Sequence, residues 1–350
     1  MLKKLFTKST ATATVALMTA GLLASCTAPS QETSSADSAS PAAEGAACAA
    51  EIPEIEFGII STESQENLKP LWEPFLDAME AEIGRPVTGF YATDYAGVIE
   101  AMGAGKLQIA WYGGKAYIEA AERSNAEVFA QTVNADGTQG YYSHLITNVD
   151  NPILQNIDVE KGDGDQYVIQ NAADLTFAFN DPESTSGFLV PTYYVFAKNG
   201  VNPNEAFEEL LFSGSHEATA QAVANNQVDV ATNNSESLLR LEESDPAARE
   251  KVQIIWTSPI IPSDPIAYRN DLPDCLKEEI RTFFYSYTDA AVLEPLGWSK
   301  FVEAEDSQWN TIRELEIAKD ILEVQNDANL SEADKQTQLD ELNQKLEALQ

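Results

Sequence analysis

Histidine and cysteine are scarce in this chain, which has two histidines and three cysteines among its 350 residues. They do not form the closely spaced groups that a zinc site requires, so the sequence indicates no metal and no cofactor. The acidic residues are dispersed, and no nucleophile stands in a motif with an evident base or a metal-ligand cluster. The sequence therefore predicts a protein that is not an enzyme.

Basic residues are also few. The chain has 21 lysines and arginines against 56 aspartates and glutamates, which gives a formal net charge of -35 at pH 7. Nucleic-acid binding depends on Lys and Arg contacts to phosphates, and the chain has no basic stripe, so nucleic acid is excluded as a partner. A small anion is not excluded, because neutral donors and helix N-termini can bind it locally despite the negative overall field.

The apolar run near the N-terminus, residues 13–23, is too short to be a permanent membrane span. Three lysines precede it, and it leads to Leu23-Ala24-Ser25-Cys26, which resembles the bacterial lipobox. Residues 1–25 are therefore predicted to be a lipoprotein signal peptide. Cleavage before Cys26 and lipidation of its sulfur would anchor the protein in the periplasm or on the extracytoplasmic face. The alternative is a chance cysteine after an ordinary signal peptide.

Aromatic residues are absent from 27–50, a segment rich in Ser, Ala, Thr, Pro and Glu. Such a segment cannot bury a core, so residues 26–51 are predicted to be a flexible linker after the lipidated cysteine. Cys48 and Cys275 then remain as cysteines without lipid. An oxidising extracytoplasmic compartment permits a disulfide between them, and two unpaired thiols are the alternative.

The remaining residues, about 300, alternate between short apolar runs and segments with helical periodicity. Strands are predicted at 56–60, 87–91, 107–112, 128–133, 141–147, 175–179, 228–231 and 252–256. Helices are predicted at 68–83, 95–102, 188–198 and 217–225, with a polar surface loop at 158–170. This alternation predicts an α/β protein of parallel sheets covered by helices, whose ligands bind where strands end and helices begin.

Three consecutive hydroxyl residues, Ser184, Thr185 and Ser186, precede the apolar helix predicted at 188–198. Pro182 favours a turn before them, so free backbone N-H groups at the start of the helix should point outward. Hydroxyls and N-H groups in this arrangement are typical of a site for a phosphate-like anion. The alternative is that Ser184 or Thr185 only caps the helix.

Several motifs in unbroken order between residues 55 and 287 closely resemble the periplasmic phosphonate-binding proteins of bacterial phosphonate ABC importers. They are 57–65 (FGIISTESQ), 94–97 (DYAG), 109–113 (IAWYG), 181–191 (DPESTSGFLVP) with 193–197 (YYVFA), 228–234 (VDVATNN), and 258–262 (SPIIP) with 264–265 (DP). The resemblance implies a two-lobed periplasmic-binding-protein fold, each lobe a mainly parallel sheet flanked by helices. We expect lobe 1 to comprise 52–143 plus 259–322, lobe 2 to comprise 144–258, and residues 323–350 to form a helical C-terminal tail.

The resemblance also implies a set of neutral donors to the phosphonate group. These residues are Tyr95, Tyr141, Ser184, Thr185, Ser186 and His216. Hydroxyls and N-H groups can bind an anion without a buried Lys or Arg. Considered without the resemblance, His216 begins an apparent helix and could equally cap it or lie on the surface. His144 has no counterpart in the family pattern and is interpreted as an ordinary strand residue.

Glu236 and Asp264 resemble the two carboxylates that receive the ammonium end of an aminoalkylphosphonate in this family. Two carboxylates beside an anion site are reasonable only if the ligand carries a positive charge at its other end. The alternatives are a favourable position in a first helical turn for Glu236 and a turn cap for Asp264. Ser263 departs from the glycine expected before Asp264, so we expect the turn that presents Asp264 to be shifted.

The sequence thus predicts a binding protein that captures a small-molecule phosphonate, 2-aminoethylphosphonate in particular, and delivers it to an ABC permease. A receptor for phosphite, phosphate or methylphosphonate is the alternative within this class, against which the two carboxylates argue. An exported phosphoryl-transfer or phosphonate-cleaving enzyme is the alternative from another class. It lacks the metal-ligand cluster or activated nucleophile that such chemistry needs.

The C-terminal region is polar and helical, with a stripe formed by Leu339, Leu342, Leu346 and Leu349. These leucines repeat at helical spacing on one face. The stripe could pack on a lobe, or it could join two copies of the chain into a homodimer. It is too brief to stand as an independent coiled coil.

Overall fold

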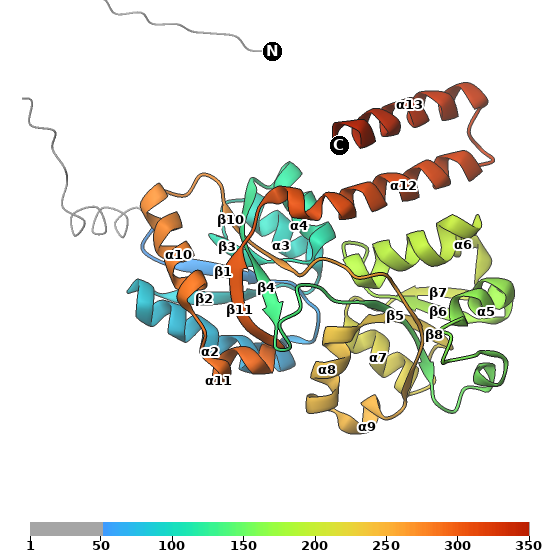
Figure 1. Cartoon of the computed structure of the whole chain (residues 1–350), viewed down its shortest axis with the longest axis horizontal. Coiled ribbons are helices and arrows are strands. Elements are labelled where there is room, and N and C mark those ends of the chain that lie inside the picture. The colour runs from blue at the N-terminus through green and yellow to red at the C-terminus, as the bar shows by residue number, and fades with distance from the viewer. Residues whose placement is uncertain (1–51, 350) are drawn as a thin grey trace, which may run out of the picture. The chain divides into compact units, whose positions relative to one another are not determined.

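The computed structural model describes residues 52–349, and within them the chain forms two β-sheets with helices packed on them (Figure 1). Lobe 1 is the six-stranded sheet with its helices, and lobe 2 is the five-stranded sheet with its helices. The strand order is β11-β4-β10-β3-β1-β2 in lobe 1 and β7-β6-β8-β5-β9 in lobe 2. Residues 1–51, which include Cys26 and Cys48, and residue 350 lie outside the described residues.

The strands agree in place with most of the predicted ones. Lobe 1 contains β1 (Ile55–Ile59), β2 (Val87–Tyr91), β3 (Ile109–Trp111), β4 (Ala126–Asn134), β10 (Pro265–Arg269) and β11 (Trp298–Glu303). Lobe 2 contains β5 (Ser143–Asn148), β6 (Thr176–Phe179), β7 (Glu209–Phe212), β8 (Val230–Asn234) and β9 (Val252–Thr257). The predicted set lacked β7, β10 and β11.

Both sheets are mixed, so the expectation of mainly parallel sheets was wrong. In lobe 1, β1 pairs in parallel with β2 and β3, whereas β10 is antiparallel to β3 and β4, and β11 is antiparallel to β4. In lobe 2, β6 is parallel to β7 and β8, whereas β5 is antiparallel to β8 and β9. A parallel neighbour needs a long crossover, usually a helix. β5 and β10 instead enter their sheets directly from the other lobe, and each runs antiparallel to its neighbouring strands.

Helices cover both sheets. They are α2 (Gln65–Ile83), α3 (Tyr95–Gly103), α4 (Gly114–Arg123), α5 (Gly164–Asn171), α6 (Pro203–Ala206), α7 (His216–Ala224), α8 (Ser235–Ser244), α9 (Pro246–Arg249), α10 (Asp274–Ser286), α11 (Ala290–Leu293), α12 (Asn310–Asn326) and α13 (Glu332–Ala348). Among them, α2, α3, α4 and α10 pack on strands of lobe 1, and α5, α7 and α8 pack on strands of lobe 2. The surface loop predicted at 158–170 is wrong from Gly164 onward, because α5 buries Val168 against the lobe.

An aromatic cluster forms the centre of lobe 1. Trp72 and Phe75 lie three residues apart on α2 and therefore on one face of that helix. The Trp72 ring lies 5.3 Å from the Phe57 ring of β1 and 5.3 Å from the Trp111 ring of β3, centroid to centroid. Trp298 of β11 is within 5.7 Å of Trp111. Trp111 is thus a core residue, and its buried ring fixes the end of β3 that leads toward the site.

The helix predicted at 188–198 begins earlier and has wide turns. It contains two π-helical segments, Thr185–Leu189 and Thr192–Phe196. Pro191 lies between them and cannot donate a backbone hydrogen bond, and its ring collides with the carbonyl of the preceding turn in a regular α-helix. The wider π geometry accommodates it, and it places Thr185 and Ser186 within the first turn, where both are buried.

The C-terminal tail is an antiparallel pair of helices (Figure 1). α13 packs against α12, and α12 packs on α4 of lobe 1 and on the π-helical segments of lobe 2. The four leucines of the predicted stripe are half-buried. This packing within one chain does not test the expected homodimer, which stays a prediction.

Two further features concern residues 52–349. None of the helices there combines the length and apolar character needed to cross a membrane. Cys275, next to the N-terminus of α10, is disulfide-bonded. Its predicted partner Cys48 lies outside the described residues, so the pairing between these two cysteines stays a prediction.

Candidate functional site

Two chain segments connect the lobes, one between β4 and β5 and one between β9 and β10. They are tied to each other by backbone bonds, in which Tyr141 N-H donates to the Ile261 carbonyl (3.0 Å) and Ile261 N-H donates to the Tyr141 carbonyl (2.8 Å). Asp264 lies at the end of the second segment, where the Thr132 N-H donates to its carbonyl (3.1 Å). Ser263 has no positive φ, so the turn before Asp264 does not need a glycine. Tyr141 and Asp264 are therefore presented by the connections themselves.

The other predicted site residues stand at the start of a helix, as its N-cap or at its first or second position. Asp94, Ser184, Ser215 and Asn234 each cap a helix by accepting a hydrogen bond from a backbone N-H three residues later. The residues that follow them are Tyr95 on α3, Thr185 at the first π-helical segment, His216 on α7 and, two positions after Asn234, Glu236 on α8. All eight predicted site residues are buried, between 1% and 8% exposed. Helix N-termini carry partial positive charge, which favours an anion.

The three consecutive hydroxyl residues, hereafter the cradle, have different neighbours. Ser184 accepts from the Gly187 N-H (2.9 Å), so the capping interpretation holds for this residue. Thr185 Oγ1 accepts from the Lys115 N-H of α4 in lobe 1 (2.9 Å). Ser186 Oγ lies 3.3 Å from His216 Nε2 and accepts from Asn234 Nδ2 (3.1 Å). Each hydroxyl accepts a hydrogen bond from the protein, and the Ser186 hydroxyl can also donate to His216 Nε2 when no ligand is bound.

His216 is held in one tautomer by Asn234. The Asn234 Oδ1 accepts from the Ser237 N-H (2.7 Å), which fixes the amide so that Nδ2 faces His216 Nε2 at 3.0 Å. Burial lowers the pKa of His216 to about 3, and the Arg240 charge adds to this, while Glu63 opposes it. The neutral ring therefore carries its proton on Nδ1, which has no hydrogen-bond partner within the described part of the chain.

Tyr95 lies near the cradle through Asn180, whose Nδ2 donates to the Ser184 hydroxyl (3.3 Å) and reaches the Tyr95 hydroxyl at 3.5 Å. The Tyr95 backbone N-H donates to Asp181 of lobe 2 (3.3 Å). Burial raises the pKa of Tyr95, and the Asp181 charge raises it further. Burial likewise raises the pKa of Tyr141, next to Asp264 and Glu236, while the Thr185 hydroxyl opposes the shift. Both phenols therefore stay protonated and can donate.

The two predicted ammonium ligands are buried without full satisfaction. Glu236 Oε1 and Asp264 Oδ1 have no hydrogen-bond partner among residues 52–349. Burial raises the pKa of Glu236 despite the nearby Arg240. Burial and the Glu236 charge raise the pKa of Asp264 well above its usual range, although Arg240, Tyr141 and Trp111 oppose the shift. A pair of carboxylates in this condition is stabilised by a cation.

Gly113 lies between the cradle and Asp264. A Cβ atom at Gly113 would lie 3.3 Å from Thr185 Oγ1 and 4.0 Å from Asp264 Oδ1. The cradle and the carboxylates therefore face one small region, across which a ligand with an anionic and a cationic end could extend.

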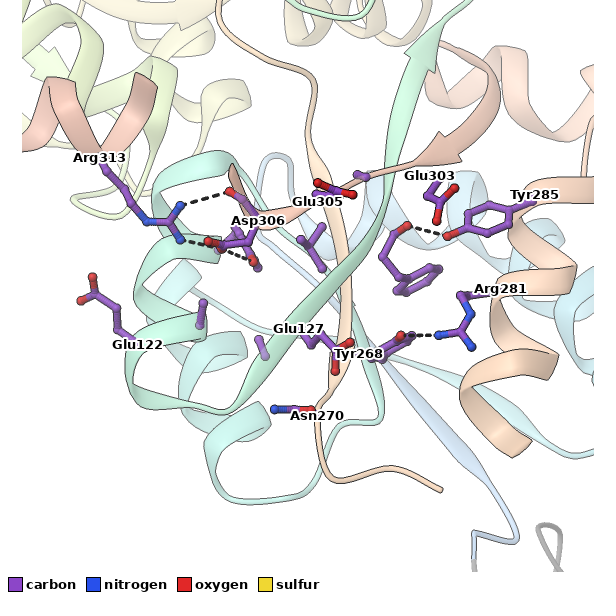
Figure 2. Close-up of a pocket in the computed structure, with 16 residues that line it drawn as sticks. Glu122, Glu127, Tyr268, Asn270, Arg281, Tyr285, Glu303, Glu305, Asp306 and Arg313 are labelled. Carbon is purple, nitrogen blue, oxygen red and sulfur yellow. Dashed lines mark hydrogen bonds and ion pairs between the residues drawn. The ribbon is translucent and has the colours of Figure 1, made fainter. Parts of the chain in front are cut away.

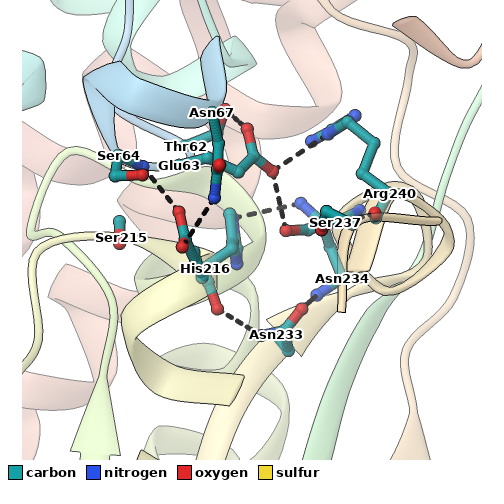
Figure 3. Close-up of polar contacts among 12 residues, drawn as sticks. Thr62, Glu63, Ser64, Asn67, Ser215, His216, Asn233, Asn234, Ser237 and Arg240 are labelled. Atoms are coloured by element: carbon teal, nitrogen blue, oxygen red, sulfur yellow. Dashed lines mark hydrogen bonds and ion pairs between the residues drawn. The ribbon is translucent and has the colours of Figure 1, made fainter. Parts of the chain in front are cut away.

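Sequence reasoning assigned no individual role to several residues of this region. Glu63 and Arg240 form a buried ion pair between the lobes, with Nε to Oε1 at 2.9 Å (Figure 3). Asn180 and Asn234 orient the cradle and His216. Asn180 follows β6 and Asn234 ends β8, and ligands of such sheets bind at strand ends. Arg240 lies one helical turn after Glu236 on α8. These positions are the signals in the sequence that could have identified the three residues.

His144 was predicted to be an ordinary strand residue. It lies on β5, with Nδ1 at 3.0 Å from the Thr257 hydroxyl. Burial lowers the pKa of His144 to about 4. It forms no hydrogen bond with the predicted site residues.

A hollow of about 660 Å³ lies elsewhere, on lobe 1 (Figure 2). Its lining includes Glu127, Tyr268, Arg281 and Arg313, and none of the predicted site residues. Arg313 is paired with Asp306, and Arg281 donates to the Tyr268 hydroxyl (2.8 Å). No group of three or more potential metal ligands occurs within residues 52–349.

Comparisons with known proteins identify the family. Residues 57–309 match the family model described as an ABC transporter, phosphonate, periplasmic substrate-binding protein. The phosphonates-binding periplasmic protein of Escherichia coli K12 is 47% identical over 306 residues, which cover 84% of this chain and 87% of that protein.

Solved structures give the same result. A binding-protein component of an ABC phosphonate transporter from Pseudomonas aeruginosa is 47% identical, with a TM-score of 0.79 over 85% of this chain and 96% of that one. A Prochlorococcus marinus protein in complex with methylphosphonate shares the fold at 21% identity and a TM-score of 0.66, over 75% of this chain and 96% of that one.

These matches confirm the two-lobed fold. The relatives are substrate-binding proteins, which confirms the prediction that the chain is not an enzyme. This family is periplasmic, in agreement with the expected compartment. The chain belongs to the periplasmic substrate-binding proteins of phosphonate ABC transporters.

Proposed function

We propose that this protein captures 2-aminoethylphosphonate, or a closely related aminoalkylphosphonate, and delivers it to an ABC permease. The observation that carries the proposal is the pair of unpartnered carboxylate oxygens, Glu236 Oε1 and Asp264 Oδ1, beside a cradle of neutral donors. An unpaired buried carboxylate costs on the order of several kcal/mol, so two of them in one site favour a ligand that brings a positive charge.

The phosphonate end is assigned to the cradle with Tyr95, Tyr141 and His216. Each of these groups is neutral and can donate a hydrogen bond, as the raised tyrosine pKa values and the lowered histidine pKa support. Hydrogen bonds to a charged acceptor are each worth roughly 1.5 to 3 kcal/mol. Several of them, with the helix N-termini, can replace the water around a small anion in a protein of strong negative charge.

The ammonium end is assigned to Glu236 and Asp264. Phosphite, phosphate and methylphosphonate lack a cationic group, so each would leave both carboxylates without a counter-charge. A receptor for those ligands, the alternative within this class, is therefore disfavoured by the same two residues. The relative solved with methylphosphonate shows that the fold accepts such ligands in another protein.

We further propose that the lobes open and close about the two connecting segments, with lobe 1 formed by 52–143 plus 259–322 and lobe 2 by 144–258. The strands of the two sheets divide at these positions to within one residue. Since the site residues are at most 8% exposed, a ligand can enter only when the lobes separate. Small-angle scattering should give a smaller radius with 2-aminoethylphosphonate than without it, and identical profiles would remove hinge closure from the mechanism.

Anchoring by a lipidated Cys26 and docking to the permease complete the proposal. The signal peptide and the lipobox-like motif support the anchor. Mass spectrometry of the mature protein should find diacylglycerol on an N-terminal Cys26. Release of the Cys26→Ser variant from the membrane fraction would support the same assignment, and an unlipidated mature N-terminus elsewhere would contradict it.

Calorimetric titration with a panel of ligands tests the central proposal. The panel should comprise 2-aminoethylphosphonate, ethylphosphonate, methylphosphonate, phosphite and phosphate. The first should bind tightest, because it alone carries the ammonium group. Equal or tighter binding of methylphosphonate, phosphite or phosphate would transfer the assignment to the alternative.

A further inference from the structure

The loop after β1 places a third carboxylate beside α8. Glu63 Oε1 accepts from Arg240 Nε (2.9 Å) and from the Ser237 hydroxyl (2.9 Å), and the Thr62 hydroxyl donates to Glu63 Oε2 (Figure 3). The Glu63 and Arg240 side chains are 8% and 10% exposed. Glu63 comes from lobe 1 and Arg240 from lobe 2, so this ion pair forms between the lobes.

Arg240 has a second carboxylate within its own helix. Glu236 precedes it by four residues on α8, the spacing and order at which a glutamate and a cation pair along a helix. Within residues 52–349, however, the carboxylate within 4.0 Å of Arg240 is that of Glu63. Glu236 Oε1 is left without a hydrogen-bond partner in the same region. Glu63 therefore pairs with the Arg240 guanidinium that Glu236 could otherwise bind.

The electrostatics of the three carboxylates agree with this division. Burial alone would raise the pKa of Glu63, but the Arg240 charge and the hydroxyls of Thr62 and Ser237 lower it overall. Burial raises the pKa of Glu236, and the Glu63 charge adds to this. Glu63 is thus ionised and paired, whereas Glu236 lacks a full counter-charge.

We propose that Glu63 determines ligand specificity by holding Arg240 away from Glu236, which leaves the Glu236 carboxylate free for the ligand's ammonium group. Glu63 acts through Arg240 and is a positioning residue rather than a ligand contact. This inference rests on the proposed function, since it concerns the same ammonium end. When Glu63 loses its charge, Arg240 turns to Glu236 along α8, and the ligand's amine meets a guanidinium instead of a free carboxylate.

Three variants test the inference by calorimetric titration with 2-aminoethylphosphonate and ethylphosphonate, which differ in the amine. The measured quantity is the ratio of the two dissociation constants. Glu63→Gln should reduce the preference for the amine about tenfold or more. Glu63→Gln with Arg240→Met removes both members of the ion pair, so neither is left buried without its partner and no guanidinium remains near Glu236. The preference should then return. Glu66→Gln, an exposed glutamate three residues later, is the matched control and should match the wild type.

The outcomes separate this role from a simple bridge between the lobes. If the ion pair only bridged the lobes, Glu63→Gln would weaken the binding of both ligands equally, and the binding of both would stay weak in the double variant. Either result would overturn the inference. If Glu63→Gln does not fold, the double variant still decides, because loss of the amine preference there would also overturn it. A wild-type protein without any amine preference would instead overturn the proposed function, and this inference with it, before any variant is made.

Discussion

The two ends of the site satisfy their polar atoms in opposite ways. The cradle hydroxyls accept hydrogen bonds from backbone N-H groups and from Asn234, and they are neutral. The carboxylates of Glu236 and Asp264 each keep an unpartnered oxygen, and burial raises the pKa of both. The first end is organised before a ligand arrives. We expect the ligand to complete the second.

This difference assigns separate tasks to the two ends. A preorganised set of neutral donors binds any phosphonate, whatever its other end carries. Unpaired buried carboxylates reject ligands that cannot supply a cation, because such ligands leave the charge uncompensated. Affinity should therefore reside mainly in the cradle and selectivity in the carboxylates, and substitutions at each end should separate the two properties.

The largest expected effect is at the cradle. Thr185→Val keeps the branched shape but removes a hydroxyl that is proposed to donate to the ligand and that accepts the Lys115 N-H of lobe 1. All phosphonates should lose about tenfold to somewhat over a hundredfold in affinity, since a hydrogen bond to a charged group is worth roughly 1.5 to 3 kcal/mol. Calorimetry measures this, with Thr185→Ser as the control that keeps the hydroxyl. Unchanged affinity in a folded Val variant would leave Thr185 with a structural role alone.

At the other end, Glu236→Gln should change selectivity. 2-Aminoethylphosphonate should lose about tenfold to a hundredfold in affinity, because a charge-assisted hydrogen bond worth roughly 1.5 to 3 kcal/mol is removed. Ethylphosphonate should bind as well or better, since its apolar end no longer faces an unpaired carboxylate. Glu242→Gln, an exposed glutamate of the same helix, is the matched control. Equal weakening of both ligands would make Glu236 structural and leave the aminoalkyl assignment to Asp264.

The sequence predicted that the three cradle hydroxyls stand at the start of a helix, because these residues are adjacent in the chain and belong to a dense motif. It also predicted most strands of the sheets, since short apolar runs such as β1 and β6 signal themselves locally. β10 and β11 were missed, and with them the antiparallel parts of lobe 1. The Glu63 to Arg240 pair joins residues 177 positions apart. Such a pairing depends on how the lobes meet, which no local pattern reports.

His216 provides a finer test within the neutral end. Asn234 leaves its proton on Nδ1, so His216→Asn keeps a donor near the δ position, whereas His216→Gln moves it to the ε position. The Gln variant should bind every phosphonate about threefold to tenfold more weakly than the Asn variant, the range of a single hydrogen bond partly replaced by a flexible amide. Titration of both variants with ethylphosphonate avoids any contribution from the amine. Tighter binding by the Gln variant would assign the donor to Nε2 instead.

The smallest effect concerns stability and Asp264. Its pKa is raised in the folded protein by burial and by Glu236, so the folded state retains a proton that the unfolded state releases above about pH 3.9. The stabilisation from this proton is complete below that pH and is lost as pH rises through the folded pKa. Asp264→Asn should therefore raise the unfolding midpoint of the ligand-free protein at pH 7 by about 2 to 4 °C, the shift that about 1 kcal/mol produces. The gain should shrink toward pH 4. Thermal unfolding at both pH values measures this gain, and Asp150→Asn, at an exposed aspartate, is the control. A lower midpoint for Asp264→Asn than for the wild type at pH 7 would mean that a counter-charge in the protein already pairs with the Asp264 carboxylate.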